Sequence, residues 1–162
     1  MKLRATMPSL SGATEWLNGE MTREQLIGQK LTLIHFWSVS CHLCKKAMPQ
    51  INDFRNHYRD SLHVVAVHMP RTAEDENIEN VKLVAAEHQI TQPILIEGHL
   101  KVKEAFENQY VPSYYLFDEM GVLRHYQAGG SSMKMLEKRV NRLASETEQA
   151  KYEQVKHVTV EE

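Results

Sequence analysis

The chain has 162 residues, of which 42% are hydrophobic and 25% are charged, and its formal net charge is -2 at pH 7. This composition is ordinary for a globular protein with one hydrophobic core. The weak negative charge gives no basic surface for nucleic acid or an anionic membrane, and no segment approaches the run of about 18 apolar residues that a membrane span requires. We expect one domain over residues 1–148 and a polar tail over residues 149–162 that is a frayed helix or disordered.

The first half of the chain predicts two core strands joined by a helix. Residues 1–30 contain a proline and several glycines around short apolar pieces, which indicates an irregular arm or an edge hairpin. The apolar run Leu31–Trp37 predicts an interior strand, and apolar residues at helical spacing predict a helix over residues 41–59. The valine-rich run Leu62–Met69 predicts the second core strand. A right-handed crossover would make these two strands parallel.

The second half predicts a further helix, a strand hairpin and a closing helix. The tight turn at Gly121 makes the two strands of the hairpin antiparallel. The sequence therefore predicts an α/β fold in which a central mixed β-sheet is flanked by helices. The expected elements are an amphipathic helix ending near Gln89, an extended segment at Ile94–Ile96, a short helix over Leu100–Asn108, strands at Tyr114–Phe117 and Val122–Ala128, and a last helix with Leu136 and Val140 on its inner face.

The two cysteines of the chain, Cys41 and Cys44, form a CxxC motif that follows the first core strand and opens a helix. Cysteines three residues apart on a helix face the same side, so one disulfide can close reversibly, although so small a ring adds little stability. At the helix start, free backbone N–H groups favour a thiolate, and Lys45, Lys46 and protonated His42 add positive charge. We predict that Cys41 is the nucleophile and that Cys44 is the resolving thiol.

Two other kinds of protein could use this motif. A non-enzymatic module could bind a partner, or hold zinc through Cys41, Cys44 and a histidine, but the chain has no second CxxC, no H-x₃-H and no HExxH run. A thiol peroxidase would reduce peroxide through a sulfenic acid. That chemistry needs a P-x₃-T-x₂-C pattern, and Ile34 stands where the pattern requires proline. The sequence predicts neither a metal nor a cofactor.

Location and partners follow from the same features. The N-terminal residues 1–8 lack the apolar core of a secretory signal, so the cytoplasm is the expected location. In a reducing compartment, a lone CxxC is more often catalytic or metal-binding than structural. The chain lacks the glycine fingerprint of a dinucleotide site, so an upstream thiol reductant, such as a thioredoxin or thioredoxin reductase, would restore the dithiol. We expect a monomer that acts on disulfide-containing proteins and binds neither nucleic acid nor membranes.

The segment Phe36–Pro49, which reads FWSVSCHLCKKAMP, resembles the thioredoxin superfamily. Pro49 lies eight residues after Cys41, and a Val-Pro pair precedes a late strand. Within the superfamily, the chain is similar to the TlpA/ResA-like thiol-disulfide oxidoreductases, most of all to the small cytosolic enzymes of bacilli, from Lys2 to about Glu148. The resemblance implies a thioredoxin-like fold with a helix inserted after the second core strand, in about Arg71–Gln89.

The resemblance also implies roles for individual residues. Trp37 would pack beside the active helix. Pro112 would be in a cis peptide that faces the dithiol, where the backbone of Val111 would pair with an extended substrate strand. His35 stands where thioredoxins keep a buried aspartate, and it could take a proton from Cys44 or be a neutral core residue.

The residues between the two cysteines depart from the thioredoxin pattern. His42 and Leu43 replace the Gly-Pro of CGPC, and an imidazolium beside Cys41 would raise the reduction potential, towards oxidant behaviour. In the cytosolic setting we nevertheless expect a reductase of protein disulfides.

Overall fold

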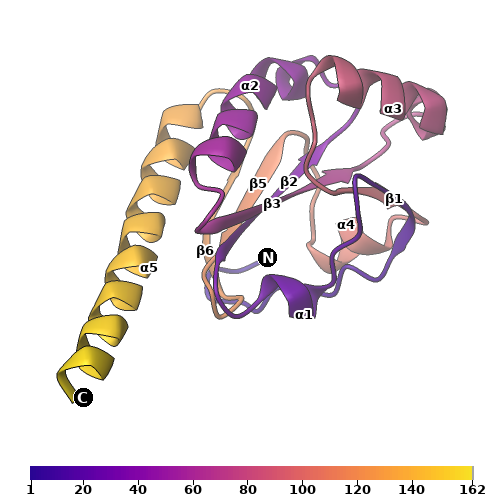
Figure 1. Ribbon diagram of the computed structural model, residues 1–162. Helices are drawn as coiled ribbons and strands as arrows, with labels where there is room; N and C mark the ends of the chain where they lie inside the picture. Colours follow the sequence, from indigo (N-terminus) through magenta and orange to yellow (C-terminus); the bar gives the residue numbers. More distant parts are fainter. Residues whose placement is uncertain (162) are drawn as a thin grey trace.

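The computed structural model describes the backbone of residues 1–161 and side chains through Val155. Six strands and the helices between them build one layered unit (Figure 1). No helix in the described part of the chain is long and apolar enough to cross a membrane. The elements in chain order are β1 (Ala13–Leu17), α1 (Arg23–Leu26), β2 (Leu31–Trp37), α2 (His42–His57), β3 (Leu62–His68), the 3₁₀ helix η1 (Ala73–Glu76), α3 (Ile78–Glu87), β4 (Ile94–Glu97), α4 (Lys101–Ala105), β5 (Ser113–Phe117), β6 (Leu123–Ala128) and α5 (Met133–Glu161).

The strands form one mixed sheet in the order β1-β4-β3-β2-β5-β6. β2 pairs with β3 in parallel, and β3 pairs with β4 in parallel. β5 runs antiparallel to both β2 and β6, and β1 runs antiparallel to β4. The predicted parallel core and antiparallel hairpin are therefore confirmed, as is the mixed sheet with helices on both faces.

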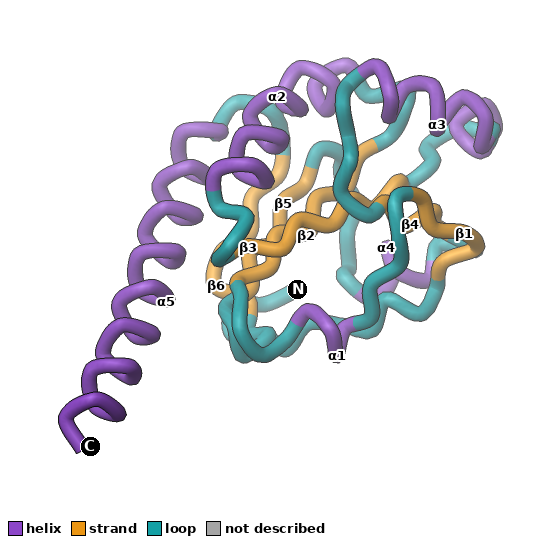
Figure 2. Tube along the Cα trace, in the orientation of Figure 1, coloured by secondary structure: helices purple, strands orange, loops and turns teal. Residues whose placement is uncertain are grey.

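Alternation along β2 divides the apolar side chains between two cores. Leu31, Leu33 and Trp37 belong to a core that includes residues of α2, α3 and α5. Ile34 and Phe36 point to the opposite face and pack in a second core with residues of the N-terminal segment, α1 and α4. Because both faces of β2 are covered, all seven of its residues are buried and its sequence reads as a continuous apolar run. Figure 2 shows the helices on the two sides of this sheet.

Two elements differ from the sequence predictions. The N-terminal segment contains no hairpin: β1 is an edge strand whose partner, β4, comes more than seventy residues later (Leu17 pairs with Ile94). α4 spans Lys101–Ala105 and is shorter than expected, because Leu100 before it and Glu107 after it have left-handed backbones, with φ of 58° and 54°. α5 continues through residues 149–161, and its C-terminal half projects away from the sheet (Figure 1). The domain boundary expected at residue 148 stays a prediction.

Candidate functional site

One end of the sheet brings the candidate residues together. β2 and β3 are parallel and end side by side, with Trp37 paired to His68. β5 is antiparallel to β2 and therefore starts at this end, where Ser113 pairs with Phe36 and with Ala128 of β6. Several loops consequently meet here: the one that leads from β2 to the CxxC motif, the one that follows β3, the one that precedes β5 and the one that follows β6.

Cys41 is the N-cap residue of α2, as the sequence predicts. Its Sγ accepts a hydrogen bond of 3.1 Å from the backbone N–H of Cys44, so the sulfur occupies the place of a capping oxygen. The two cysteines form a disulfide with their Cα atoms 5.2 Å apart. Both are buried, with 3% of Cys41 and 1% of Cys44 exposed. Exposure therefore does little to distinguish the two thiols, whereas position relative to the helix N-terminus does.

The other predicted residues of α2 lie around this sulfur pair and at the surface. His42 and Lys46 are exposed and Lys45 is half-buried, all in the first turns of the helix. Leu43 leaves 49% of its side chain exposed between the cysteines. Pro49 lies inside α2 with its ring exposed, and the helix continues beyond it to His57.

Trp37 is buried beside His68, with the centroids of the two rings 5.0 Å apart in an edge-on arrangement. The Nε2 atom of His68 accepts a hydrogen bond of 3.3 Å from the backbone N–H of Val39, in the loop before Cys41. Burial lowers the pKa of His68 to about 4, so its imidazole is neutral at pH 7. Sequence reasoning missed His68, because nothing in a valine-rich strand indicates a contact with a loop 29 residues earlier.

His35 is buried on the α2 side of the sheet and contacts Gln92, with the two Nε2 atoms 2.9 Å apart. Arg55 fixes the orientation of the Gln92 amide, because its Nη1 donates to Gln92 Oε1 at 2.7 Å. The amide nitrogen must then donate to His35, whose Nε2 lone pair is occupied. Burial, with the charge of Arg55, lowers the pKa of His35 to about 3. We therefore propose that His35 is the neutral core residue and not the base that takes the proton of Cys44.

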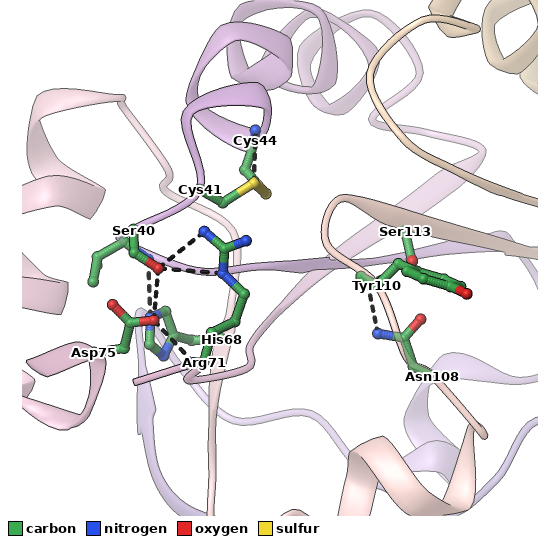
Figure 3. Close-up of a disulfide and its surroundings, with 10 residues drawn as sticks. Ser40, Cys41, Cys44, His68, Arg71, Asp75, Asn108, Tyr110 and Ser113 are labelled. Carbon is green, nitrogen blue, oxygen red and sulfur yellow. Dashed lines mark hydrogen bonds between the residues drawn. A yellow bond between two sulfur atoms is a disulfide. The ribbon is translucent and has the colours of Figure 1, made fainter. Parts of the chain in front are cut away.

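The loop before β5 carries the predicted substrate-binding pair. The Val111–Pro112 peptide is cis, as the family resemblance implies. Val111 is half-buried and packs against the core that contains both cysteines. The carbonyl of the preceding Tyr110 accepts hydrogen bonds from Asn108 Nδ2 at 2.9 Å and from Ser113 Oγ at 2.7 Å (Figure 3). These bonds fix the backbone on both sides of the cis peptide.

A groove of about 660 Å³ lies beside the CxxC motif. One wall consists of α2 residues, including Leu43 and Lys46, and the other is the segment from Gly129 to Met133. The groove places an exposed apolar side chain next to the disulfide. Among the side chains of residues 1–155, no three His, Cys, Asp or Glu groups gather as the ligands of a metal ion would.

The comparisons with known proteins agree with this geometry. The AhpC/TSA family model matches residues 4–126. The thiol-disulfide oxidoreductase YkuV of Bacillus subtilis is 65% identical over 148 residues, covering 91% of this chain and 100% of YkuV. ResA of Halalkalibacterium halodurans is 24% identical, covering 83% of this chain and 74% of ResA. The solution structure of a thioredoxin-like protein in the oxidised form superposes with a TM-score of 0.84 at 64% identity, covering 90% of this chain and 99% of that one. The chain thus belongs to the AhpC/TSA family and is a thioredoxin-like thiol-disulfide oxidoreductase.

Proposed function

We propose that this chain is a cytosolic, monomeric reductase of protein disulfides with Cys41 as its nucleophile. The observation that carries the proposal is the position of Cys41 at the N-cap of α2, where its sulfur already accepts the N–H of Cys44. In the reduced protein, that N–H and the positive end of the helix dipole stabilise a thiolate at Cys41. Cys44 lies one turn further from the helix N-terminus and receives less of this stabilisation.

The reaction consists of two thiol-disulfide exchanges. The Cys41 thiolate attacks one sulfur of the substrate disulfide, so a Cys41–substrate bond forms, the substrate S–S bond breaks and the departing sulfur takes a proton. Cys44 then loses its proton and attacks Cys41 Sγ, which releases the second substrate thiol and leaves the Cys41–Cys44 disulfide. The substrate gains two electrons and two protons. An upstream thiol reductant, such as a thioredoxin or thioredoxin reductase, returns the chain to the dithiol.

The surroundings of the sulfur pair suit a polypeptide substrate. The groove between Leu43 and the Gly129–Met133 segment offers an apolar contact, and the backbone of Val111 next to Pro112 would pair with an extended strand that carries the substrate disulfide. Trp37 and Pro49 support the helix that presents Cys41. Lys45 adds positive charge near it, and His42 adds more when it is protonated.

Insulin reduction in the presence of dithiothreitol tests the chemistry. The wild-type chain should accelerate precipitation of the insulin B chain, and Cys41→Ser should not. Cys44→Ser is the matched variant, because it keeps the attacking thiol and loses the resolving one. It should accumulate a mixed disulfide that mass spectrometry assigns to Cys41. Full activity of Cys41→Ser would refute the assignment, and peroxide reduction or stoichiometric zinc in the reduced protein would favour the peroxidase or the zinc-binding module.

The direction of electron flow is tested by equilibration against a glutathione series. A potential below about -220 mV makes the dithiol a reductant in the cytosol, whereas a value above about -180 mV makes it an oxidant. We expect the lower range. Size-exclusion chromatography with light scattering tests the monomer.

A further inference from the structure

Three hydrogen bonds connect the loop that carries Cys41 to the segment after β3. The hydroxyl of Ser40, the residue before Cys41, donates to Asp75 Oδ2 at 2.7 Å. The same oxygen accepts from Arg71 Nε at 3.3 Å and from Arg71 Nη2 at 3.1 Å. The side chain of Ser40 therefore joins an acid and a base that both come from a different part of the chain.

Asp75 fixes both ends of this arrangement. It lies in η1 and is 2% exposed, although Glu74 and Glu76 on either side are exposed. Besides the Ser40 hydroxyl, its Oδ2 accepts the backbone N–H of Arg71 at 2.9 Å. Burial alone would raise the pKa of Asp75, but the hydrogen bonds from Arg71 and Ser40 hold it below its usual range. One buried carboxylate thus holds the backbone of Arg71 directly and its side chain through Ser40.

The result is a fixed positive charge beside the nucleophile. The guanidinium of Arg71 is bonded to the residue next to Cys41, and Figure 3 shows it on the side of Ser40 that faces the disulfide, with the Asp75 carboxylate on the other side. Arginine remains charged at any working pH, and its planar fork is held by two contacts with one oxygen. Lys46 is exposed, as Arg71 is, but its ammonium group is a point charge on a flexible side chain.

The remaining titratable groups near the sulfur differ from Arg71 either in their charge or in how firmly their side chains are held. On α2 these are the exposed His42 and the half-buried Lys45. At the end of β3, His68 is neutral at pH 7, because burial lowers its pKa to about 4. The Arg71 side chain, in contrast, donates to Ser40 in the active-site loop, and the buried carboxylate of Asp75 accepts from both Ser40 and the Arg71 backbone.

We propose that Arg71 stabilises the Cys41 thiolate by its charge, and that Ser40 and Asp75 are positioning residues that hold the guanidinium at that sulfur. The proposal rests on the assignment of Cys41 as nucleophile and names the group that tunes it. When the disulfide is reduced, negative charge appears on Cys41 Sγ, and a cation already in place needs no rearrangement to interact with it. In general, a unit charge about 6 Å from a thiol changes its ionisation constant roughly threefold even at the dielectric constant of water.

The test follows the Cys41 thiolate by its ultraviolet absorbance as a function of pH, in the full chain carrying Cys44→Ser. Arg71→Gln removes the charge, and Arg71→Lys keeps the charge but loses the fork. Ser40→Ala removes the anchor without changing any charge. Lys46→Gln is the matched control, because it removes one positive charge from the exposed surface of the helix that carries Cys41.

At pH values below the midpoint of the titration, we expect Arg71→Gln to lower the thiolate fraction at least threefold. Ser40→Ala should lower it by a smaller factor. Arg71→Lys should lie between the parent and Arg71→Gln, and Lys46→Gln should have less effect than Arg71→Gln. An unchanged titration in Arg71→Gln, or equal shifts in Arg71→Gln and Lys46→Gln, would overturn the proposal.

The same experiment separates this proposal from the proposed function. A Cys44→Ser chain that titrates as a free thiol, together with a wild-type chain that does not reduce insulin, would contradict the function. An acidic Cys41 in the Cys44→Ser chain and full insulin reduction by the wild-type chain, together with an unmoved Arg71→Gln titration, would contradict only the role of Arg71.

Discussion

Two buried histidines should make this protein lose stability in mild acid, and the loss can be assigned to each of them. His35 accepts a hydrogen bond from Gln92, and His68 accepts one from the backbone of Val39. Protonation of either Nε2 atom replaces an acceptor by a donor that faces another donor, in a site without solvent. Lowering the pH is therefore a perturbation aimed at both contacts at once.

The magnitude follows from the shifts in pKa. Burial, with the charge of Arg55, lowers the pKa of His35 from 6.5 to about 3, and burial lowers that of His68 from 6.5 to about 4. Between these values and 6.5, the unfolded chain binds more protons than the folded one, so stability falls as the pH falls. From about pH 7 to about pH 5, each histidine should remove about 2 kcal/mol from the free energy of unfolding.

The assay is urea unfolding of the oxidised protein, followed by tryptophan fluorescence at a series of pH values. His35→Gln and His68→Gln keep an acceptor for the same donor but cannot titrate, so each should reduce the acid-induced loss by about 2 kcal/mol. The exposed His57→Gln is the control and should leave the pH dependence as in the wild type. If His35→Gln loses as much stability between the two pH values as the wild type, the neutral, hydrogen-bonded state of His35 is refuted.

Two further substitutions test the loop before β5 and the turn between β5 and β6, which lie at opposite ends of β5. Asn108→Ala should lower the free energy of unfolding by about 2 kcal/mol, because Asn108 Oδ1 accepts a hydrogen bond of 2.8 Å from the buried Tyr115 hydroxyl. In urea unfolding, the double variant with Tyr115→Phe should lose clearly less stability than the sum of the two single losses, and strict additivity would contradict this. Gly121→Ala should lower the stability measured by thermal unfolding by about 1–2 kcal/mol, because Gly121 has φ of 77° and a Cβ there would lie 2.5 Å from Ile27 Cδ1. Gly130→Ala is the control: its Cβ would meet Leu43 at 3.4 Å, so it should lose less stability, and equal losses would contradict the steric argument.

Local sequence patterns were sufficient for the core of the fold. β2 and β3 are buried on both faces and therefore appear as apolar runs, and the spacing of apolar residues after Cys41 is that of one buried helix face. The turn at Gly121 set the antiparallel hairpin. With these elements in place, the CxxC motif falls at the start of α2.

Contacts between distant segments were beyond the sequence. β1 has the composition of a loose arm, and only its pairing with β4 makes it a strand. Asp75 stands between two glutamates, and nothing in that acidic run shows which carboxylate turns inward to Ser40. The two interpretations of His35 depended on Gln92, 57 residues away, and on Arg55, whose contact fixes the Gln92 amide. In each case the deciding partner is far away in the chain and unremarkable by itself.

The most direct test of the account is differential alkylation of the reduced wild-type protein. Iodoacetamide is added at a series of pH values, and peptide mapping gives the rate at each cysteine. We predict that Cys41 reacts first and that its rate levels off well below the ordinary thiol pKa of about 8.5, while Cys44, which receives less stabilisation as a thiolate, reacts more slowly. Equal rates at both cysteines, each rising through about 8.5, would contradict the stabilised thiolate at the N-terminus of α2.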